Sequence, residues 1–252
     1  MLIADFFTVL RYNSKKAILR RLSFNKRKHY YRKGTYSEEI IWDGRRFLFP
    51  DPKKKMGDGM WVFRNVQNDA LDYANGKRIK EKPKLPVNYW NPKRKYVKSE
   101  VSATDVDHAY WRIAFLDGII SQKTYDKGLL VKDKAMRLAA LANLASSKEY
   151  QVIKDGQITD ETIILKYSPI MHKVYNNIRY TCFEHMMNMA NLLGDDFICY
   201  KTDCIYYKSS ESNRQLVEQY LDSASLYWKH LKLVETPNKK EINPDDDTYK
   251  QL

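Results

Sequence analysis

Residues 196–208 read Asp196-Phe-Ile-Cys-Tyr-Lys-Thr-Asp203-Cys-Ile-Tyr-Tyr-Lys208, and this stretch decides the expected fold. Two runs rich in aromatic and aliphatic residues, 196–200 and 203–208, meet at the polar pair Thr202-Asp203. Such runs favour β-strands, and a short polar break between them favours a turn. The stretch therefore predicts a strand–turn–strand hairpin with Asp203 at its turn.

The segments on either side of this hairpin alternate between helical and strand-like patterns. Residues 168–193 have helical periodicity and are followed by Gly194, a residue typical of a helix C-terminus. The other expected elements are a strand at 99–106, a helix or turn at 107–120, an Ala/Leu-rich helix at 127–147, two short strands in 148–165 around Asp155-Gly156, a helix at 211–224 and a strand at 229–235. This order predicts an α+β fold, with an antiparallel sheet and helices on one face.

The first hundred residues have a different composition. Residues 6–33 predict one or two basic helices, and residues 34–50 predict two strands around Asp43-Gly44. Prolines in residues 77–98 favour an extended segment. We therefore expect two regions, a basic N-terminal region at 1–98 and an α+β domain at 99–252.

Positive charge is concentrated in the N-terminal region. The whole chain of 252 residues has a net charge of +13. Residues 1–100 hold 25 Lys and Arg against 10 Asp and Glu, whereas the rest of the chain is slightly acidic. A localised positive field attracts polyanions. We therefore expect sequence-independent binding of nucleic-acid phosphates by ten residues: Lys15, Lys16, Arg20, Arg21, Lys26, Arg27, Lys93, Arg94, Lys95 and, from a motif described below, Lys229.

The same composition argues against other classes of protein. No run of 18 apolar residues is present, so we expect no membrane span and no membrane partner. The N-terminus lacks the basic leader of a signal peptide. Three cysteines without a CxxC pattern indicate reduced thiols, and the expected location is cytoplasmic or otherwise intracellular.

Two motifs combine acidic and aromatic residues at the ends of expected strands. The segment Asp105-Val-Asp-His-Ala-Tyr110 resembles motif A of family B DNA polymerases, and Tyr200-Lys-Thr-Asp203 resembles their motif C. The resemblance implies that Asp105 and Asp203 are catalytic metal ligands, joined by the backbone carbonyl of Val106. It implies that Tyr110 packs under the incoming sugar and excludes a 2′-hydroxyl. Lys201 departs from motif C, because the family has an Asp there, and this lowers the local negative charge.

A third motif lies between these two. Arg137-Leu-Ala-Ala-Leu-Ala-Asn-Leu-Ala resembles motif B, in which a Lys on a helix grips the nucleotide triphosphate. Arg137 takes that position, and Lys134 lies one turn earlier. The family's Tyr-Gly pair is replaced by Leu144-Ala145. Lys229 falls where the family has a Lys that meets the primer terminus.

The resemblance covers about residues 99–235 and implies a polymerase-like palm with compressed fingers, a short thumb and no exonuclease. Phosphoryl transfer of this kind uses two Mg²⁺ ions, with Mn²⁺ as a substitute, held by hard oxygen ligands. The expected partners are a DNA template and primer, dNTPs and a replication protein. The expected function is a minimal DNA polymerase acting in replication or priming.

Three alternatives stay open. A non-catalytic palm would bind nucleic acid or a replication partner without turnover, as Lys201 and the altered motif B suggest. An unrelated α+β nucleic-acid binder would carry these motifs by chance. A reverse-transcriptase-type palm ranks lower, because its motif C has two adjacent Asp residues and this chain has Thr202-Asp203.

Overall fold

The computed structural model of the protein describes residues 7–9, 15–24, 28–34, 37–43, 45–50, 60–93, 100–131, 134–166 and 168–231. The chain forms two compact units, and each is discontinuous in sequence. The first unit comprises residues 1–80 and 119–175, and the second comprises residues 81–118 and 176–252. Neither unit coincides with the predicted ranges 1–98 and 99–252.

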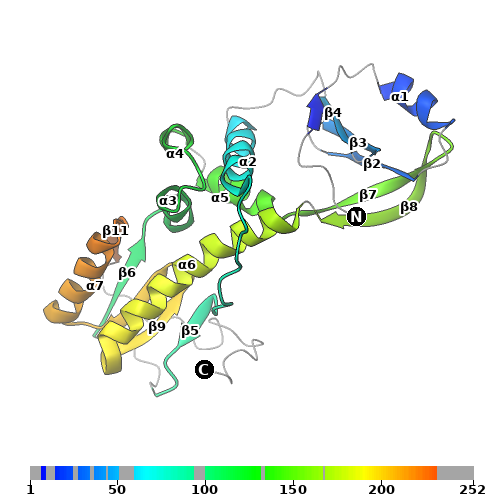
Figure 1. The fold of residues 1–252 in the computed structure, drawn as a ribbon. Coiled ribbons are helices and arrows are strands. Elements are labelled where there is room, and N and C mark those ends of the chain that lie inside the picture. Colours follow the sequence, from blue (N-terminus) through cyan, green and yellow to red (C-terminus); the bar gives the residue numbers. More distant parts are fainter. Residues whose placement is uncertain are drawn as a thin grey trace. The chain divides into compact units, whose positions relative to one another are not determined.

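The first unit is built on a sheet with the strand order β1-β4-β3-β2-β7-β8 (Figure 1). All neighbouring strands are antiparallel except β1 and β4, which are parallel. The strands are β1 (Phe7–Val9), β2 (His29–Lys33), β3 (Ser37–Trp42), β4 (Arg45–Pro50), β7 (Ser147–Lys154) and β8 (Gln157–Lys166). The helices are α1 (Lys15–Leu22), α2 (Met60–Ala74), α4 (Gln122–Leu129) and α5 (Lys134–Ala142).

Pairing between β2 and β7 explains why this unit is discontinuous. His29 lies opposite Ile153, and Tyr31 lies opposite Gln151. The hairpin of β7 and β8 was predicted correctly from Asp155-Gly156, but its partner is a strand of the N-terminal region. Local sequence patterns do not reveal such a pairing, because the two strands are more than a hundred residues apart.

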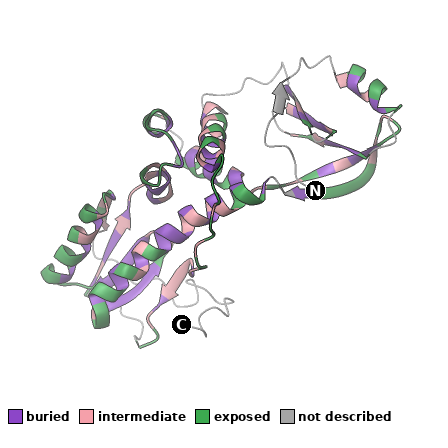
Figure 2. Cartoon of the chain, viewed as in Figure 1, coloured by how far each residue is buried: buried purple, intermediate pink, exposed green. Residues whose placement is uncertain are grey.

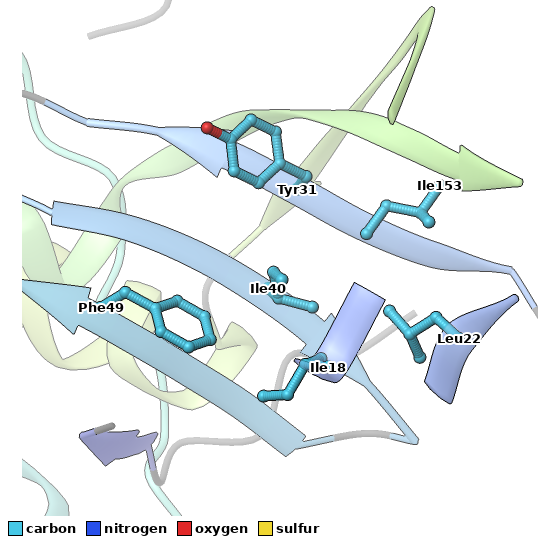
Figure 3. Close-up of a cluster of buried hydrophobic side chains, with 6 residues drawn as sticks. All are labelled: Ile18, Leu22, Tyr31, Ile40, Phe49 and Ile153. Atoms are coloured by element: carbon cyan, nitrogen blue, oxygen red, sulfur yellow. The ribbon is translucent and has the colours of Figure 1, made fainter. Parts of the chain in front are cut away.

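One face of this sheet is covered by α1. Ile18 and Leu22, one helical turn apart, are buried on the strands below them. The close-up in Figure 3 shows these two side chains with the four strand residues that complete the cluster, namely Tyr31, Ile40, Phe49 and Ile153. The predicted basic helices at 6–33 are therefore confirmed only for residues 15–22. Residues 29–33 form a strand instead, because Tyr30 and Tyr31 are buried on opposite faces of the sheet.

The sheet also buries a charged network centred on Glu39, whose side chain is 3% exposed. Arg46 donates to both carboxylate oxygens, with Nε–Oε2 and Nη2–Oε1 distances of 3.1 and 3.3 Å. The Tyr150 hydroxyl donates to Oε2 over 2.9 Å, and Arg32 and Lys148 approach Oε1 at 3.3 and 3.5 Å. A buried carboxylate needs such partners, because it has lost its hydration.

This network makes the stability of the protein vary with pH in the alkaline range. Burial, reinforced by Arg46 and Arg32 against the opposing attraction of Glu39, lowers the pKa of Lys148 from 10.5 to about 8. Above pH 8 the unfolded chain keeps a proton that folded Lys148 has released, so the free energy of unfolding should increase with pH up to about pH 10. We expect a gain of at most about 2 kcal/mol. Denaturant unfolding at pH 8 and pH 9.5 checks this, and Lys148→Met should lack the increase.

The second unit is built on a sheet with the order β11-β6-β10-β9-β5, in which all neighbours are antiparallel (Figure 1). Its strands are β5 (Asn88–Trp90), β6 (Val101–Val106), β9 (Phe197–Lys201), β10 (Cys204–Lys208) and β11 (Trp228–Leu231). Its helices are α3 (Ala109–Leu116), α7 (Glu211–Ser223) and all but the first turns of α6 (Pro169–Leu193). The predicted hairpin at 196–208 is confirmed, as are the helices α6 and α7.

Helix α6 carries the core of this unit. Its buried residues recur every three or four positions, and Figure 2 shows them along one side of the helix, with exposed residues along the other. They include Ile178, Cys182, Phe183, Met186, Met189, Ala190 and Leu193. His185 on α6 bonds the hydroxyl of Tyr220 on α7 over 2.9 Å, so the two helices lie against each other.

The predicted α+β class is confirmed by these elements, and all strand pairs except β1–β4 are antiparallel, although the strands form two sheets rather than one. One predicted helix differs: residues 127–147 do not form a single helix but parts of α4 and α5, followed by a 3₁₀ turn at Asn143–Ala145. Within the described ranges, no helix has the length and apolar character that crossing a bilayer requires.

Candidate catalytic carboxylate site

Asp105 and Asp203 come together where two central strands of the second unit meet. Asp105 is the last but one residue of β6 and lies opposite Cys204, the first residue of β10. The backbone N–H of Val106 donates to the carbonyl oxygen of Asp203 over 2.9 Å. Two acidic residues separated by 98 positions in the sequence are thus held at adjoining strand ends, as motifs A and C predict.

The turn that carries Asp203 is strained and tightly held. Thr202 has a φ of 58°, a left-handed conformation that is unfavourable for a β-branched residue. The Thr202 N–H donates to the carbonyl oxygen of Val87 and to Oδ1 of Asn88, each at 3.0 Å. Strain of this kind persists only where the surroundings enforce it, and it is concentrated at functional sites. Sequence reasoning missed Val87 and Asn88, which give no local signal because they lie 115 residues before the turn.

Tyr110 on α3 packs against the helix α6, which also contacts this turn. Cys182 on α6 approaches the carbonyl oxygen of Thr202 with its Sγ at 4.0 Å. The next residue, Phe183, meets the ring of Tyr110 edge to face, with ring centroids 6.5 Å apart. Consecutive residues of α6 therefore position the turn with Asp203 and the predicted sugar-contacting tyrosine.

Lys229 on β11 completes the charged cluster. It lies opposite Asp105, and its Nζ is 3.1 Å from Oδ2 of that residue. The hydrogen bond and charge of Asp105, with further attraction from Asp107 and Asp203, raise the pKa of Lys229. The side chain of Lys229 is 54% exposed, whereas that of Asp105 is 22% exposed. The Lys229 ammonium therefore lies on the solvent side of the more buried Asp105 carboxylate.

A second network locks β11 on the other face of the sheet. Side chains alternate along a strand, so Thr104 and His230 face away from Asp105 and Lys229. His230 Nδ1 is 3.0 Å from the Thr104 hydroxyl, which is 2.9 Å from the Tyr207 hydroxyl. His230 Nε2 is 2.5 Å from Oε1 of Glu218 on α7. These bonds fix the strand register that brings Lys229 to Asp105.

The cysteines do not contribute reactive thiolates to the site. Burial, with added repulsion from Asp105 and Asp203, raises the pKa of Cys204 to about 12. Burial also raises the pKa of Cys182 well above its usual value. Both thiols are protonated at neutral pH, so the donors that can meet a cation here are oxygen atoms.

The residues predicted for the nucleotide triphosphate belong to the first unit. Arg137 is buried, and its guanidinium donates to the carbonyls of Gly128 and Val131 over 3.0 and 2.9 Å. These bonds give it a structural role, because they join α5 to the C-terminal end of α4 and to Val131. Its contact with a triphosphate stays a prediction. Lys134 is exposed at the start of α5, where its ammonium is open to an anion.

The predicted nucleic-acid-binding residues have different settings. On α1, Lys16, Arg20 and Arg21 are exposed. Lys15 instead forms an ion pair with Glu38 on β3 and lies over the ring of Tyr31. In the second unit, Lys93 is exposed. Four predicted residues lie outside the described part of the chain: Lys26, Arg27, Arg94 and Lys95.

The chemistry of the acidic residues fits a hard divalent cation. Mg²⁺ is bound in enzymes through one or two carboxylates together with water and substrate phosphates. Asp105, Asp203 and the Val106 carbonyl are donors of that kind. Within the described residues, no group of three His, Cys, Asp or Glu side chains is arranged to hold a metal. The Asp105 carboxylate is already paired with one cation, the ammonium of Lys229.

Comparisons with protein-family models, curated proteins and solved structures found no significant match to the chain. The resemblance to family B DNA polymerases therefore rests on the motifs themselves and on their positions.

Proposed function

We propose that this protein is a minimal, metal-dependent DNA polymerase-like nucleotidyltransferase that acts in replication or priming. The observation that supports the proposal is the junction of β6 and β10, where the hydrogen bond from the Val106 N–H to the Asp203 carbonyl joins the backbones of the two motifs. Single acidic residues at strand ends are common. An adjoining pair beside a strained turn, with an aromatic residue five positions after the first, is a far more specific arrangement.

The proposed chemistry asks little covalent work of the side chains. Mg²⁺ held by carboxylates supplies electrostatic stabilisation of the charge that develops on the phosphoryl group. Asp105 and Asp203 would hold the ion through their carboxylate oxygens, and the carbonyl of Val106 is the third proposed donor. Tyr110, held by Phe183, packs under the sugar of the incoming dNTP and disfavours a 2′-hydroxyl.

Binding of template and primer is assigned to the basic residues. Lys16, Arg20 and Arg21 on α1 are exposed and close together in sequence, as contacts to successive phosphates require. Such contacts are independent of sequence and weaken with salt. A replication protein partner would complement the compressed fingers and the short thumb that the resemblance implies.

A second candidate function is a non-catalytic palm that binds nucleic acid or a replication partner. Two lysines favour it: Lys229 pairs with Asp105, and Lys201 ends β9 at the position where the family has the first Asp of motif C. Both lower the negative charge of the site and so weaken its attraction for a divalent cation.

Primer extension separates the two candidates. Full-length protein is incubated with Mg²⁺, dNTPs and a labelled primer annealed to a longer template. We expect extension that stops when EDTA removes the metal, with lower yield at higher salt. Absence of extension by protein that still binds the primer–template in a salt-sensitive way would contradict the enzyme and support the non-catalytic palm.

A further inference from the structure

Lys229 holds a position that the binding of a divalent cation must disturb. Its ammonium contacts Oδ2 of Asp105 at 3.1 Å, and Asp107 and Asp203 add to the attraction. A divalent cation on Asp105 needs the same carboxylate. Two cations that share one carboxylate repel each other strongly at such short range.

We propose that Lys229 is an internal counter-cation of the Asp105–Asp203 site, which neutralises Asp105 in the metal-free protein and is displaced when a divalent cation binds. This inference rests on the proposed function for the metal site itself. It adds a role for Lys229, the neutralisation of Asp105, that the motifs do not assign. It makes Lys229 a determinant of metal affinity.

The two partners differ in their freedom to move. More than half of the Lys229 side chain is exposed, so its four-carbon stem can turn into water with little loss of packing. Asp105 is less exposed and lies on a central strand, between β10 and β11. Displacement therefore moves the lysine and leaves the carboxylate in place.

The backbone beneath Lys229 is fixed, which keeps the ammonium within reach of Asp105. The neighbours of Lys229 on β11 are both anchored to α7. His230 bonds Glu218, and the Trp228 indole N–H donates to Oδ1 of Asp222 over 3.0 Å. A single-residue slip of β11 would carry Lys229 to the opposite face, and these anchors prevent it.

Direct measurement of Mn²⁺ binding to the full chain, by electron paramagnetic resonance and calorimetry without nucleic acid, tests the inference. Lys229→Met removes the competing charge and should bind Mn²⁺ up to about fivefold more tightly, because the metal no longer has to break a partly exposed ion pair with Asp105. Lys229→Arg keeps the charge and should bind like the wild type. Lys229→Gln serves as a second neutral variant if Lys229→Met folds poorly, as judged by circular dichroism.

The matched control is Lys208→Met. Lys208 is an exposed lysine on β10, opposite Val101, about 13 Å along the sheet from Asp105. At that distance a charge is largely screened in physiological salt, so its removal should leave Mn²⁺ affinity unchanged. The gain from Lys229→Met should also vanish in an Asp105→Asn background, because the two residues act on each other.

The outcomes separate this inference from the proposed function. Tighter Mn²⁺ binding by Lys229→Met, together with no primer extension by the wild type, would support the counter-cation role and overturn the proposed polymerase activity. Equal or weaker Mn²⁺ binding by both neutral variants would overturn the counter-cation, even if the wild type extends primers. Failure of the wild type and of both neutral variants to bind Mn²⁺ would overturn it as well.

Discussion

Asp203→Asn is expected to lower the rate of templated nucleotide addition about a thousandfold, because metal-ion catalysis contributes several kcal/mol of transition-state stabilisation. Asparagine keeps the size of the side chain and removes the charge that holds the cation. The strained turn is held through the backbone N–H of Thr202, so the fold should be unchanged. Single-turnover primer extension, with melting temperature as a check of folding, measures the effect. Asp105→Asn should behave in the same way.

Asp195→Asn is the matched control for these variants. Asp195 is an exposed acidic residue in the 3₁₀ turn between α6 and β9, in the same unit. Its replacement makes the same change of charge and should leave the rate close to that of the wild type. An equal loss of activity in Asp195→Asn and Asp203→Asn would show that general charge, rather than the carboxylate at the turn, sets the rate.

Glu39→Gln is expected to reduce the free energy of unfolding by about 3 kcal/mol, the usual cost of breaking a buried ion pair from one side. The change leaves Arg46 and Lys148 buried beside an uncharged amide, and it weakens the acceptor that Tyr150 uses. Burial alone would raise the pKa of Glu39, but the nearby charges, chiefly that of Arg46, outweigh burial and lower it. The carboxylate is therefore charged in the folded protein at neutral pH. Urea unfolding followed by circular dichroism measures the loss.

Glu161→Gln provides the comparison on the same sheet. Glu161 on β8 is exposed and pairs with Lys154, so solvent screens the interaction and its loss should change stability little. The account of the buried network would be contradicted if Glu39→Gln were as stable as Glu161→Gln. Partial recovery in Glu39→Gln combined with Lys148→Met would confirm that the cost comes from unpaired charge.

Local patterns were sufficient to predict the parts of the fold that are local. Runs of aromatic and aliphatic residues on either side of Thr202-Asp203 predicted β9 and β10, and helical periodicity predicted α6 and α7. Pairing of β2 with β7 joins segments that are distant in sequence, and nothing in either segment names its partner. The two units are therefore discontinuous in a way that composition alone could not reveal.

The candidate site, too, could be predicted only in part from the sequence. The resemblance to motifs A and C implied that Asp105 and Asp203 meet at one site, and the strands that carry or follow them, β6 and β10, are paired. The contact of Lys229 with Asp105 depends on the exact register of β11, because a shift of one residue would reverse its face. The side chain of Arg137 donates to the carbonyls of Gly128 at the end of α4 and of Val131 just after it, and its sequence position gave no sign of this.

The most direct test of the central claim is single-nucleotide incorporation on four templates that differ only in the base after the primer end. Each reaction contains Mg²⁺ and one dNTP, with wild-type protein and Asp203→Asn side by side. If the paired carboxylates perform templated nucleotidyl transfer, the wild type adds only the nucleotide that matches each template, and Asp203→Asn adds almost none. Addition that ignores the template, or equal addition by both proteins, would contradict it.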